Sequence, residues 1–450
     1  MSALDKMSDW TTRVRRGDGP IYVAIADALE TAIRDGALHP GDRLPPQRAL
    51  AARLGVDLTT ITRAYDLART RGLIEGTVGR GSFVRQMVED ADPILVDLSM
   101  NLPPPPQGVK LGERLRDTAD AILTAADASV LMAYSAGFGT TGQRAAGAHW
   151  LAPVLGEVAP DRLLIAPGAQ AALAATLTAL LKPSDSLVVE ALAYPGVIGL
   201  ARMLGLTLLA CPCDADGLIP QALSEICARQ APKALYLTPT LQNPTTATLP
   251  LARREAVAAL AERGGLIVIE DDPYALLAQT PLPAIAALAP ANTVHLATLS
   301  KCLSPGLRIA YLAAPPAWMA PIADALRALA VMPSPLMAAV ATRWIQEGDA
   351  AALLAAVCEE ARARRAIAAR VLPAAIGAET SIHVWLPLRD HASAGRLRAA
   401  AAARGLALLT DEAFATGADH PAGARISFGG PSQRAVLEKG LAAIAELTGA

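Results

Sequence analysis

The sequence predicts two domains of different class, a small α+β domain at the front and a large α/β domain behind it. In the front part, apolar residues recur at helical spacing in three short segments, and two short strand-like runs follow them. From residue 162 on, near-continuous apolar runs alternate with Ala- and Leu-rich stretches of helical length. Such alternation is typical of a largely parallel sheet with helices on both faces. The 450 residues also exceed the roughly 100–200 that one domain takes.

Composition narrows the class of protein. Apolar residues make up 52 % and charged residues 18 %, which excludes a disordered chain. The net charge is −2, but residues 1–88 carry 13 Lys and Arg against 10 Asp and Glu, and the remainder carries 27 against 32. A modestly basic front therefore precedes an acidic body. No apolar run of 18 residues or more occurs and the first ten residues are polar, so we expect no membrane contact and a cytoplasmic location.

The cysteines fit the same compartment. An odd, scattered set indicates free thiols in a reducing environment rather than a disulfide framework. Two of them form a lone C-x-C with no second pair, so we expect no metal site. The five are Cys211, Cys213, Cys227, Cys302 and Cys358.

The front domain reads as a helix-turn-helix followed by a wing. Helices are expected over 20–35, 46–54 and 58–71. Gly55 closes the second of these, and Asp57 is placed to cap the third. Two short helices joined by a tight turn that contains glycine favour a helix-turn-helix, whose second helix enters the major groove of DNA. Residues 73–84 read as two small strands around a glycine-rich tip.

The motifs of this front domain carry a resemblance. The string G-x-L-x-P-G-x-R-L-P-P-x-R-x-L-A-x-x-L-G-V, the T-R-A-Y that follows and the wing G-x-G-x-F-V resemble the GntR-type winged helix-turn-helix over about 65 residues. The resemblance implies that the protein binds a double-stranded DNA operator. Hydroxyls and helix N-terminal amides suit phosphates, and arginine suits phosphates or guanine. The matching DNA-binding positions are Arg48, Thr59, Thr60, Thr62, Gly79 and Arg80.

One position departs from the winged-helix pattern. Leu58 stands where many relatives carry a basic residue, so one backbone contact is absent or replaced by an apolar contact with a base.

In the body, the residues that carry chemistry follow the strand-like runs, where ligands bind in open α/β sheets. Lys301, one of six lysines, comes directly after such a run, and Arg308 follows seven residues later. Asp271 and Tyr274 stand in IEDDPY at the end of another run, and Asn243 stands in LTPTLQNPT. The segment APGAQAAL places glycine and two further amides at a helix start, which favours an anion site.

Together these motifs resemble the pyridoxal-phosphate enzymes of aminotransferase class I, fold type I, over roughly residues 98–450. By that resemblance Lys301 is the catalytic lysine that forms the Schiff base with pyridoxal 5'-phosphate. Asp271 pairs with the pyridine nitrogen, and Asn243 and Tyr274 bind the ring 3-hydroxyl. The phosphate is held by Gly168, Ala169, Gln170, Thr298, Ser300 and Arg308.

The resemblance also assigns three residues at the rim of the site. Tyr194 matches the aromatic residue that stacks on the ring. Tyr134 matches the tyrosine that reaches the phosphate from the partner subunit, so a homodimer is implied. Arg425 matches the arginine that binds the carboxylate of a substrate or effector. Two departures, Thr246 in place of a common glycine and a missing glycine pair before Trp385, imply a reshaped substrate pocket.

A GntR-like winged helix joined to an aminotransferase-like domain resembles the MocR subfamily of bacterial transcriptional regulators. We expect the DNA-binding domain over 18–86, a linker over 87–96 and the pyridoxal-phosphate domain over 97–450. Within the last, we expect a large subdomain at about 140–330 and a small one at about 97–135 plus 335–450. The resemblance implies a head-to-tail dimer.

The function expected is a regulator in which pyridoxal phosphate on Lys301 exchanges with a small amino-compound effector and thereby changes operator binding. A differential affinity of the effector for two states is required. Two alternatives stay open. Pyridoxal phosphate itself is the effector in one; in the other the protein is an active aminotransferase on an amino acid, and the winged helix is secondary.

Overall fold

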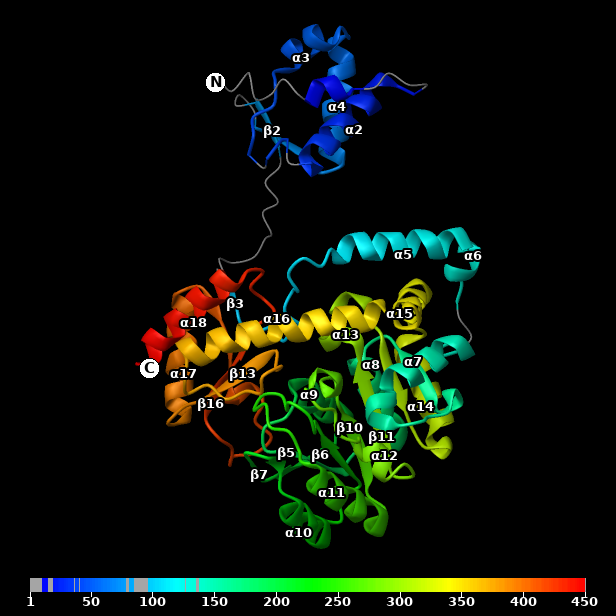
Figure 1. Cartoon of the computed structure of the whole chain (residues 1–450), viewed down its shortest axis with the longest axis vertical. Coiled ribbons are helices and arrows are strands. Elements are labelled where there is room, and N and C mark those ends of the chain that lie inside the picture. Colours follow the sequence, from blue (N-terminus) through cyan, green and yellow to red (C-terminus); the bar gives the residue numbers. More distant parts are fainter. Residues whose placement is uncertain are drawn as a thin grey trace. The chain divides into compact units, whose positions relative to one another are not determined.

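The computed structural model describes residues 10–14, 19–35, 37–39, 41–77, 81–84, 96–125, 127–134 and 137–449. The chain forms two compact units, Met1–Asp92 and Pro93–Ala450, which are treated separately below (Figure 1). Within the described residues, no helix combines the length and the apolar character that a membrane span needs.

The first unit is a winged helix-turn-helix, as the periodicity predicts. Its helix-turn-helix turn is made by Gly55, which ends one helix in the left-handed conformation with φ 63°. Asp57 is at the N-cap position of the next helix, but its side chain makes no capping hydrogen bond. The Tyr65 hydroxyl donates to the carbonyl of Pro45 at 2.8 Å and ties that helix to the loop before the turn. The elements are η1 (Trp10–Arg13), α2 (Ile21–Arg34), α3 (Gln47–Leu54), α4 (Leu58–Thr70) and the antiparallel strands β1 (Ile74–Thr77) and β2 (Gly81–Val84).

The second unit is built on a seven-stranded sheet in the order β4-β12-β11-β10-β9-β5-β6. All seven strands coincide with the apolar runs of the sequence. The sheet is mixed but mostly parallel, since β12 alone runs antiparallel to both of its neighbours. The strands are β4 (Leu163–Ala166), β5 (Ser186–Glu190), β6 (Thr207–Cys211), β9 (Ala234–Leu237), β10 (Ile267–Asp271), β11 (Thr293–Thr298) and β12 (Ala310–Ala313).

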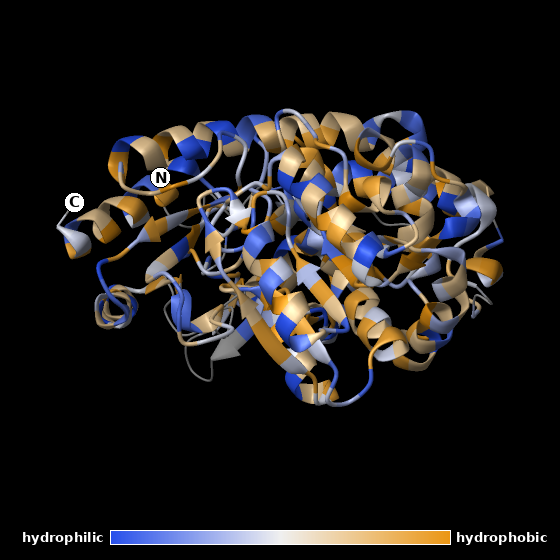
Figure 2. Cartoon of the chain, turned by 90° about the horizontal axis from the view of Figure 1, so that it is seen from below, coloured by the Kyte–Doolittle hydropathy of each residue, from blue (hydrophilic) through white to orange (hydrophobic). Residues whose placement is uncertain are grey.

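Helices cover both faces of this sheet because both faces are apolar. Successive residues of one strand enter different cores: Val188 packs in one cluster of buried side chains, and Leu187 and Val189 pack in another. Figure 2 shows apolar residues along the central strands and mixed colours on the surrounding helices. The helices of this layer are α7 (Thr141–Leu155), α8 (Ala169–Leu180), α9 (Pro195–Leu204), α10 (Pro220–Gln230), α11 (Leu251–Gly264), α12 (Ile285–Leu288), α13 (Leu299–Cys302), α14 (Pro316–Ala330) and α15 (Pro335–Glu347).

A smaller subdomain follows at the C-terminal end. It contains the antiparallel sheet β13-β16-β15 and the parallel pair β14-β3. Its bounds are β3 (Val96–Asp97), β13 (His383–Pro387), α17 (His391–Ala403), β14 (Leu406–Ala407), β15 (Leu409–Thr410), β16 (Gly423–Ser427) and α18 (Arg434–Thr448). Short elements complete the chain: α5 (Leu111–Ala125), α6 (Ala128–Leu131), β7 (Cys213–Asp214), β8 (Gly217–Leu218) and the 3-10 turns η2 (Pro160–Arg162), η3 (Ala275–Leu277), η4 (Pro305–Leu307) and η5 (Asp411–Ala413).

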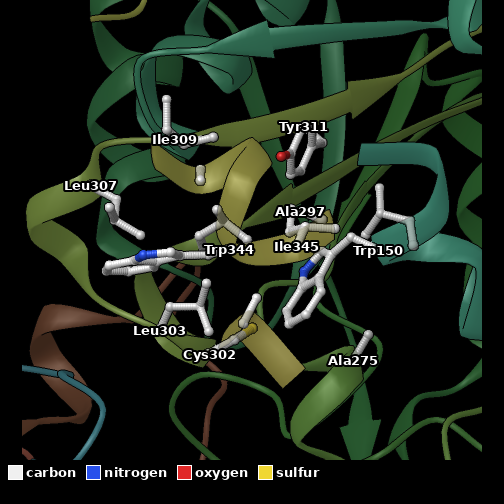
Figure 3. Close-up of a cluster of buried hydrophobic side chains, with 14 of the residues drawn as sticks. Trp150, Ala275, Ala297, Cys302, Leu303, Leu307, Ile309, Tyr311, Trp344 and Ile345 are labelled. Carbon is white, nitrogen blue, oxygen red and sulfur yellow. The ribbon is translucent and has the colours of Figure 1, made fainter. Parts of the chain in front are cut away.

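The long helix α16 (Asp349–Val371) belongs to both cores. Leu353 and Val357, near its start, pack in the large core, and Ala368, near its end, packs in the small one. Trp344 and Ile345 of α15 also lie in the large core (Figure 3). We therefore propose that the subdomain boundary falls within α16, later than the residue 335 that the sequence suggested.

Candidate functional site

A cavity of about 410 Å³ opens at the carboxyl ends of the large-sheet strands, between that sheet and the small subdomain. Most of the residues proposed from the sequence line it. They are Ala169, Gln170, Tyr194, Asn243, Asp271, Tyr274, Thr298, Ser300, Lys301, Arg308 and Arg425.

Lys301 lies in α13, directly after the end of β11. Its Nζ donates a hydrogen bond to the backbone carbonyl of Asn101 at 2.5 Å. Burial, and next the positive charge of Arg425, lower the pKa of Lys301 to about 8, and the negative charge of Asp271 opposes this shift. A lysine with this pKa has a substantial neutral fraction at physiological pH and can act as a nucleophile.

Asp271 is the last residue of β10 and is buried. Its Oδ2 accepts a hydrogen bond from the Tyr236 hydroxyl at 2.7 Å, and its Oδ1 has no partner although it is buried. Burial raises the pKa of Asp271 to about 6, and the bond from Tyr236 opposes the rise. The carboxylate is therefore mostly ionised at pH 7 and has one oxygen ready to accept from a cationic N–H group.

An anion cradle forms where α8 begins. Gly168 precedes the helix with φ 98°, and Arg308 has φ 52° and donates from Nη2 to the carbonyl of Pro167 at 3.2 Å. A Cβ atom at residue 168 would lie 2.3 Å from the Arg308 guanidinium, so this approach requires glycine. Ala169 and Gln170 are the first residues of the helix, where backbone N–H groups are free to bind an anion.

Two hydroxyls complete this side of the cavity. The Thr298 side chain accepts from the backbone N–H of Ser300 at 3.2 Å, and the Thr298 and Ser300 hydroxyls lie 3.0 Å apart. This contact fixes both side chains at the end of β11, next to Lys301.

The opposite side of the cavity is held by Arg425, a buried residue of β16. Its Nη1 donates to Oδ1 of Asn243 at 2.8 Å, and its Nη2 donates to the backbone carbonyl of Ser99. The guanidinium lies over the ring of Phe414, 5.1 Å from its centre. The arginine proposed to bind a carboxylate is thus engaged by groups of its own chain.

Tyr274 and Tyr194 occupy different levels of the site. Tyr274 is buried, and its hydroxyl accepts from the Asn101 amide at 2.8 Å. Tyr194 caps α9 and lines the cavity with its side chain partly buried. Tyr134 does not line the cavity, and 87 % of it is exposed. Its role in a partner subunit's site stays a prediction.

Sequence reasoning missed the arm of residues 99–102, which enters the cavity and supplies Asn101. The only signal was a polar residue in an otherwise apolar, proline-rich stretch. It also missed Tyr236, whose place on a buried strand two residues before Thr238 could have pointed to the same edge of the sheet.

In the first unit, the proposed DNA-binding residues lie around the N-terminus of α4. Arg48 and Thr59 are exposed and Thr60 is half-buried. The Thr62 hydroxyl lies 2.8 Å from Oε1 of Gln47 and so contacts α3. Leu58 is 41 % exposed at the first position of α4. Two further proposed positions, Gly79 and Arg80, lie outside the described residues.

The cavity suits pyridoxal phosphate on structural grounds. The buried, unpartnered Oδ1 of Asp271 can accept from a protonated ring nitrogen. The cradle at Gly168 and Arg308 suits a phosphate, and Lys301 supplies the amine that binds an aldehyde. These three features have the chemistry of the cofactor's three polar groups.

Two families match the chain. The description "Aminotransferase class I and II" matches residues 93–383, and "Bacterial regulatory proteins, gntR family" matches residues 21–84.

Individual proteins agree with both matches. The uncharacterized HTH-type transcriptional regulator YdeF of Bacillus subtilis is 33 % identical over 96 % of this chain and 95 % of its own. The vitamin B6 salvage pathway transcriptional repressor PtsJ of Salmonella typhimurium is 30 % identical over 84 % and 87 %. Among solved structures, LysN, an α-aminoadipate aminotransferase of Thermus thermophilus complexed with N-(5'-phosphopyridoxyl)-L-leucine, superposes with a TM-score of 0.72 at 26 % identity, covering 80 % of this chain and 95 % of that one.

Proposed function

Because the chain belongs to the class I and II aminotransferase family and begins with a GntR-type DNA-binding domain, the MocR combination, we propose that it is a pyridoxal-phosphate-dependent transcriptional regulator. Its second unit senses a small amino compound, or pyridoxal phosphate itself, and thereby changes operator binding by a dimer. The single observation that carries this proposal is a cavity suited to the cofactor on the same chain as a winged helix.

Each part of the cavity has a task in sensing. Pyridoxal phosphate, when bound, supplies an electrophilic carbon that takes up primary amines. Lys301 holds the cofactor through its amine, and the lowered pKa of that amine makes it available near neutral pH. Asp271 keeps the ring nitrogen protonated, and the Tyr236 hydroxyl orients the carboxylate. Asn243 and Tyr274 are placed to bind the ring hydroxyl, and Tyr194 to stack on the ring.

The arm and Arg425 form the part of the site that can report a ligand. Arg425 contacts Asn243 and the carbonyl of Ser99. An effector with a carboxylate would compete for these N–H groups and would favour a different position of residues 99–102. That difference in contacts between two states is what a ligand needs to shift an equilibrium.

DNA binding by a dimer is part of the proposal. Arg48, Thr59 and Thr60 present side chains beside the N-terminus of α4, the end of a recognition helix that reads base edges. Thr62 contributes indirectly, since its contact with Gln47 fixes α3 against α4. Tyr134, exposed in one chain, would reach the phosphate site of a head-to-tail partner.

Footprinting on the DNA upstream of the protein's own gene tests the proposal. We expect protection of a repeated site, at a salt concentration that suppresses non-specific binding, and a change in the pattern when pyridoxal phosphate or an amino compound is added. Lys301→Ala should still protect the site but lose the response, and Arg48→Ala should lose protection with the cofactor still bound. Absence of protection under all conditions would contradict the regulator.

An active aminotransferase is the second candidate. The observation that favours it is that the residues proposed for transamination, Lys301, Asp271 and Arg425, all line one cavity. Multiple turnovers of an amino acid with a keto acid, lost in Lys301→Ala, would support it. A single turnover that stops at one equivalent of product would favour sensing instead.

A further inference from the structure

A cluster of two histidines and one aspartate lies in the small subdomain, on residues that have no part in the cofactor cavity. His391 is the first residue of α17, Asp411 follows β15 in η5, and His420 lies in the loop before β16. One side-chain nitrogen or oxygen from each lies within 4.8 Å of the others. Residues from three separate segments therefore converge on one point.

The distances within the cluster suit a metal ion. His420 Nε2 lies 3.3 Å from Oδ2 of Asp411, and His391 Nδ1 lies 2.5 Å from the same oxygen. Ligand atoms about 2.0–2.1 Å from a tetrahedral Zn²⁺ ion are about 3.3 Å apart, so the His420 pair already has this spacing. The side chain of His391 is 54 % exposed, so it can turn to widen the shorter contact.

The hydrogen bonds of His420 indicate that a cation belongs beside it. Its Nδ1 lies 3.0 Å from the carbonyl oxygen of Gly417, and because a carbonyl only accepts, this nitrogen carries the hydrogen. In the neutral ring Nε2 then bears a lone pair, which faces the carboxylate oxygen of Asp411. Two acceptors at this distance require a proton or a metal ion as a partner. The carboxylate side chain of Asp411 is 4 % exposed, so its charge is little screened by water.

We propose that His391, Asp411 and His420 form a binding site for a divalent transition-metal ion such as Zn²⁺. Two imidazoles and one carboxylate are ligands that Zn²⁺ prefers, and the exposure of His391 leaves a coordination position open to solvent. The ion binds three segments of the small subdomain to one another.

The site stabilises a segment that reaches the cofactor cavity. Between Asp411 and His420, the carbonyl of Phe414 accepts from the N–H of Ala193 at 2.8 Å, and Thr416 donates from its backbone to the carbonyl of Ala191 at 3.2 Å. Phe414 also underlies the guanidinium of Arg425. A bound ion therefore fixes the support of Arg425 and the contact between the two subdomains.

Calorimetric titration of the full chain with ZnCl₂ tests the proposal. We expect one Zn²⁺ per chain, and Kd values at least about tenfold higher in His420→Gln and in His391→Ala. His149→Ala, at an exposed histidine of α7, is the matched control and should bind as the wild type does. Mg²⁺, which prefers oxygen ligands, should not compete. Equal binding by the wild type and His420→Gln would overturn the proposal, and so would no binding by the wild type.

Two further measurements separate this site from cysteine ligands and from misfolding. Co²⁺ in place of Zn²⁺ should give weak visible bands without the charge-transfer band of a thiolate ligand; an intense thiolate band lost on Cys213→Ser would overturn the assignment. Hydrogen exchange of the amides of residues 412–420 should slow when Zn²⁺ is added to the wild type and stay unchanged in His420→Gln. Thermal unfolding without metal should be the same for both proteins, since the variant loses only an ion pair at the surface of the subdomain.

Discussion

The two walls of the cofactor cavity differ in what their polar groups already contact. On the wall from the large sheet, Asp271 keeps one buried oxygen without a partner, and the Gly168 cradle is open to an anion. On the wall from the small subdomain, Arg425 donates to Asn243 and to Ser99. The first wall can accept a ligand without losing a contact, whereas the second has to exchange one.

This difference separates holding from sensing. A preorganised wall binds with little rearrangement, so it is suited to a resident cofactor. A wall whose arginine is bound by its own chain responds to a carboxylate by breaking a contact with the arm. An amino acid can therefore alter the arm in a way that the cofactor alone does not.

The largest effect should come from Lys301→Ala on the preorganised wall. The variant lacks the amine that holds pyridoxal phosphate covalently, so dialysis should remove the cofactor completely and abolish the protein-bound visible absorbance. Lys182→Ala, at an exposed lysine before β5, should retain both. Retained absorbance in Lys301→Ala after dialysis would mean that another amine holds the cofactor.

Asp271→Asn should have the next largest effect. It replaces a charged acceptor by a neutral one at the buried position where Oδ1 is unpartnered. A hydrogen bond to a charged group contributes about 1.5–3 kcal/mol, so affinity for pyridoxal phosphate should fall about 10- to 100-fold in a fluorescence titration. Asp161→Asn, at an exposed aspartate, is the charge-matched control. An unchanged Kd would remove Asp271 from the site.

Arg425→Gln tests the opposite wall. We expect the change in DNA binding caused by an amino acid to require at least about tenfold more ligand, because a charge-assisted fork to the carboxylate is lost. The response to the corresponding amine without a carboxylate should stay the same. If both ligands weaken equally, Arg425 supports the pocket and does not read the carboxylate.

The pH dependence of cofactor capture links the two walls. With the pKa of Lys301 at about 8, the rate at which the apoprotein captures pyridoxal phosphate should rise with pH and level off above that value. The charge of Arg425 lowers this pKa and that of Asp271 raises it. The midpoint should therefore move up in Arg425→Gln and down in Asp271→Asn. Stopped-flow absorbance across pH 6–10 measures it, and equal midpoints in all three proteins would contradict the coupling.

Tyr236→Phe should give the smallest change. It removes the hydroxyl that donates to Asp271, so the pKa of Asp271 should rise and cofactor affinity should fall about fivefold, the equivalent of about 1 kcal/mol. Tyr311→Phe is a matched control, since the buried Tyr311 hydroxyl has no hydrogen-bond partner. A larger loss than in Asp271→Asn would show that Tyr236 acts on more than Asp271.

The preorganised wall was also the one that could be predicted from the sequence. Its residues follow apolar strands, and the carboxyl ends of parallel strands meet at one edge of the sheet whatever the loops do. Asp271 at the end of β10 and Lys301 after β11 lie there for this reason. The three helices of the winged-helix unit were predictable because their apolar spacing and glycine ends are local signals.

The other wall depends on contacts between distant segments, which no local pattern encodes. The arm carries no periodicity, so the contacts of Asn101 with Lys301 and Tyr274 could not be foreseen. The same holds for the pairing of Arg425 with Asn243, 182 positions apart in the chain. Helix α15 was assigned to the small subdomain by its place in the sequence, but its buried Trp344 and Ile345 pack on the large core.

The helix α16 limits how the two subdomains can move. It runs for 23 residues, about 35 Å, and its two ends are buried in different cores (Figure 1). A rod fixed in this way transmits rotation: a tilt of about 5° at one end displaces the other by about 3 Å over this length. Small adjustments around the large core are thus geared up into larger shifts at α17 and α18, without any bend in the connection itself.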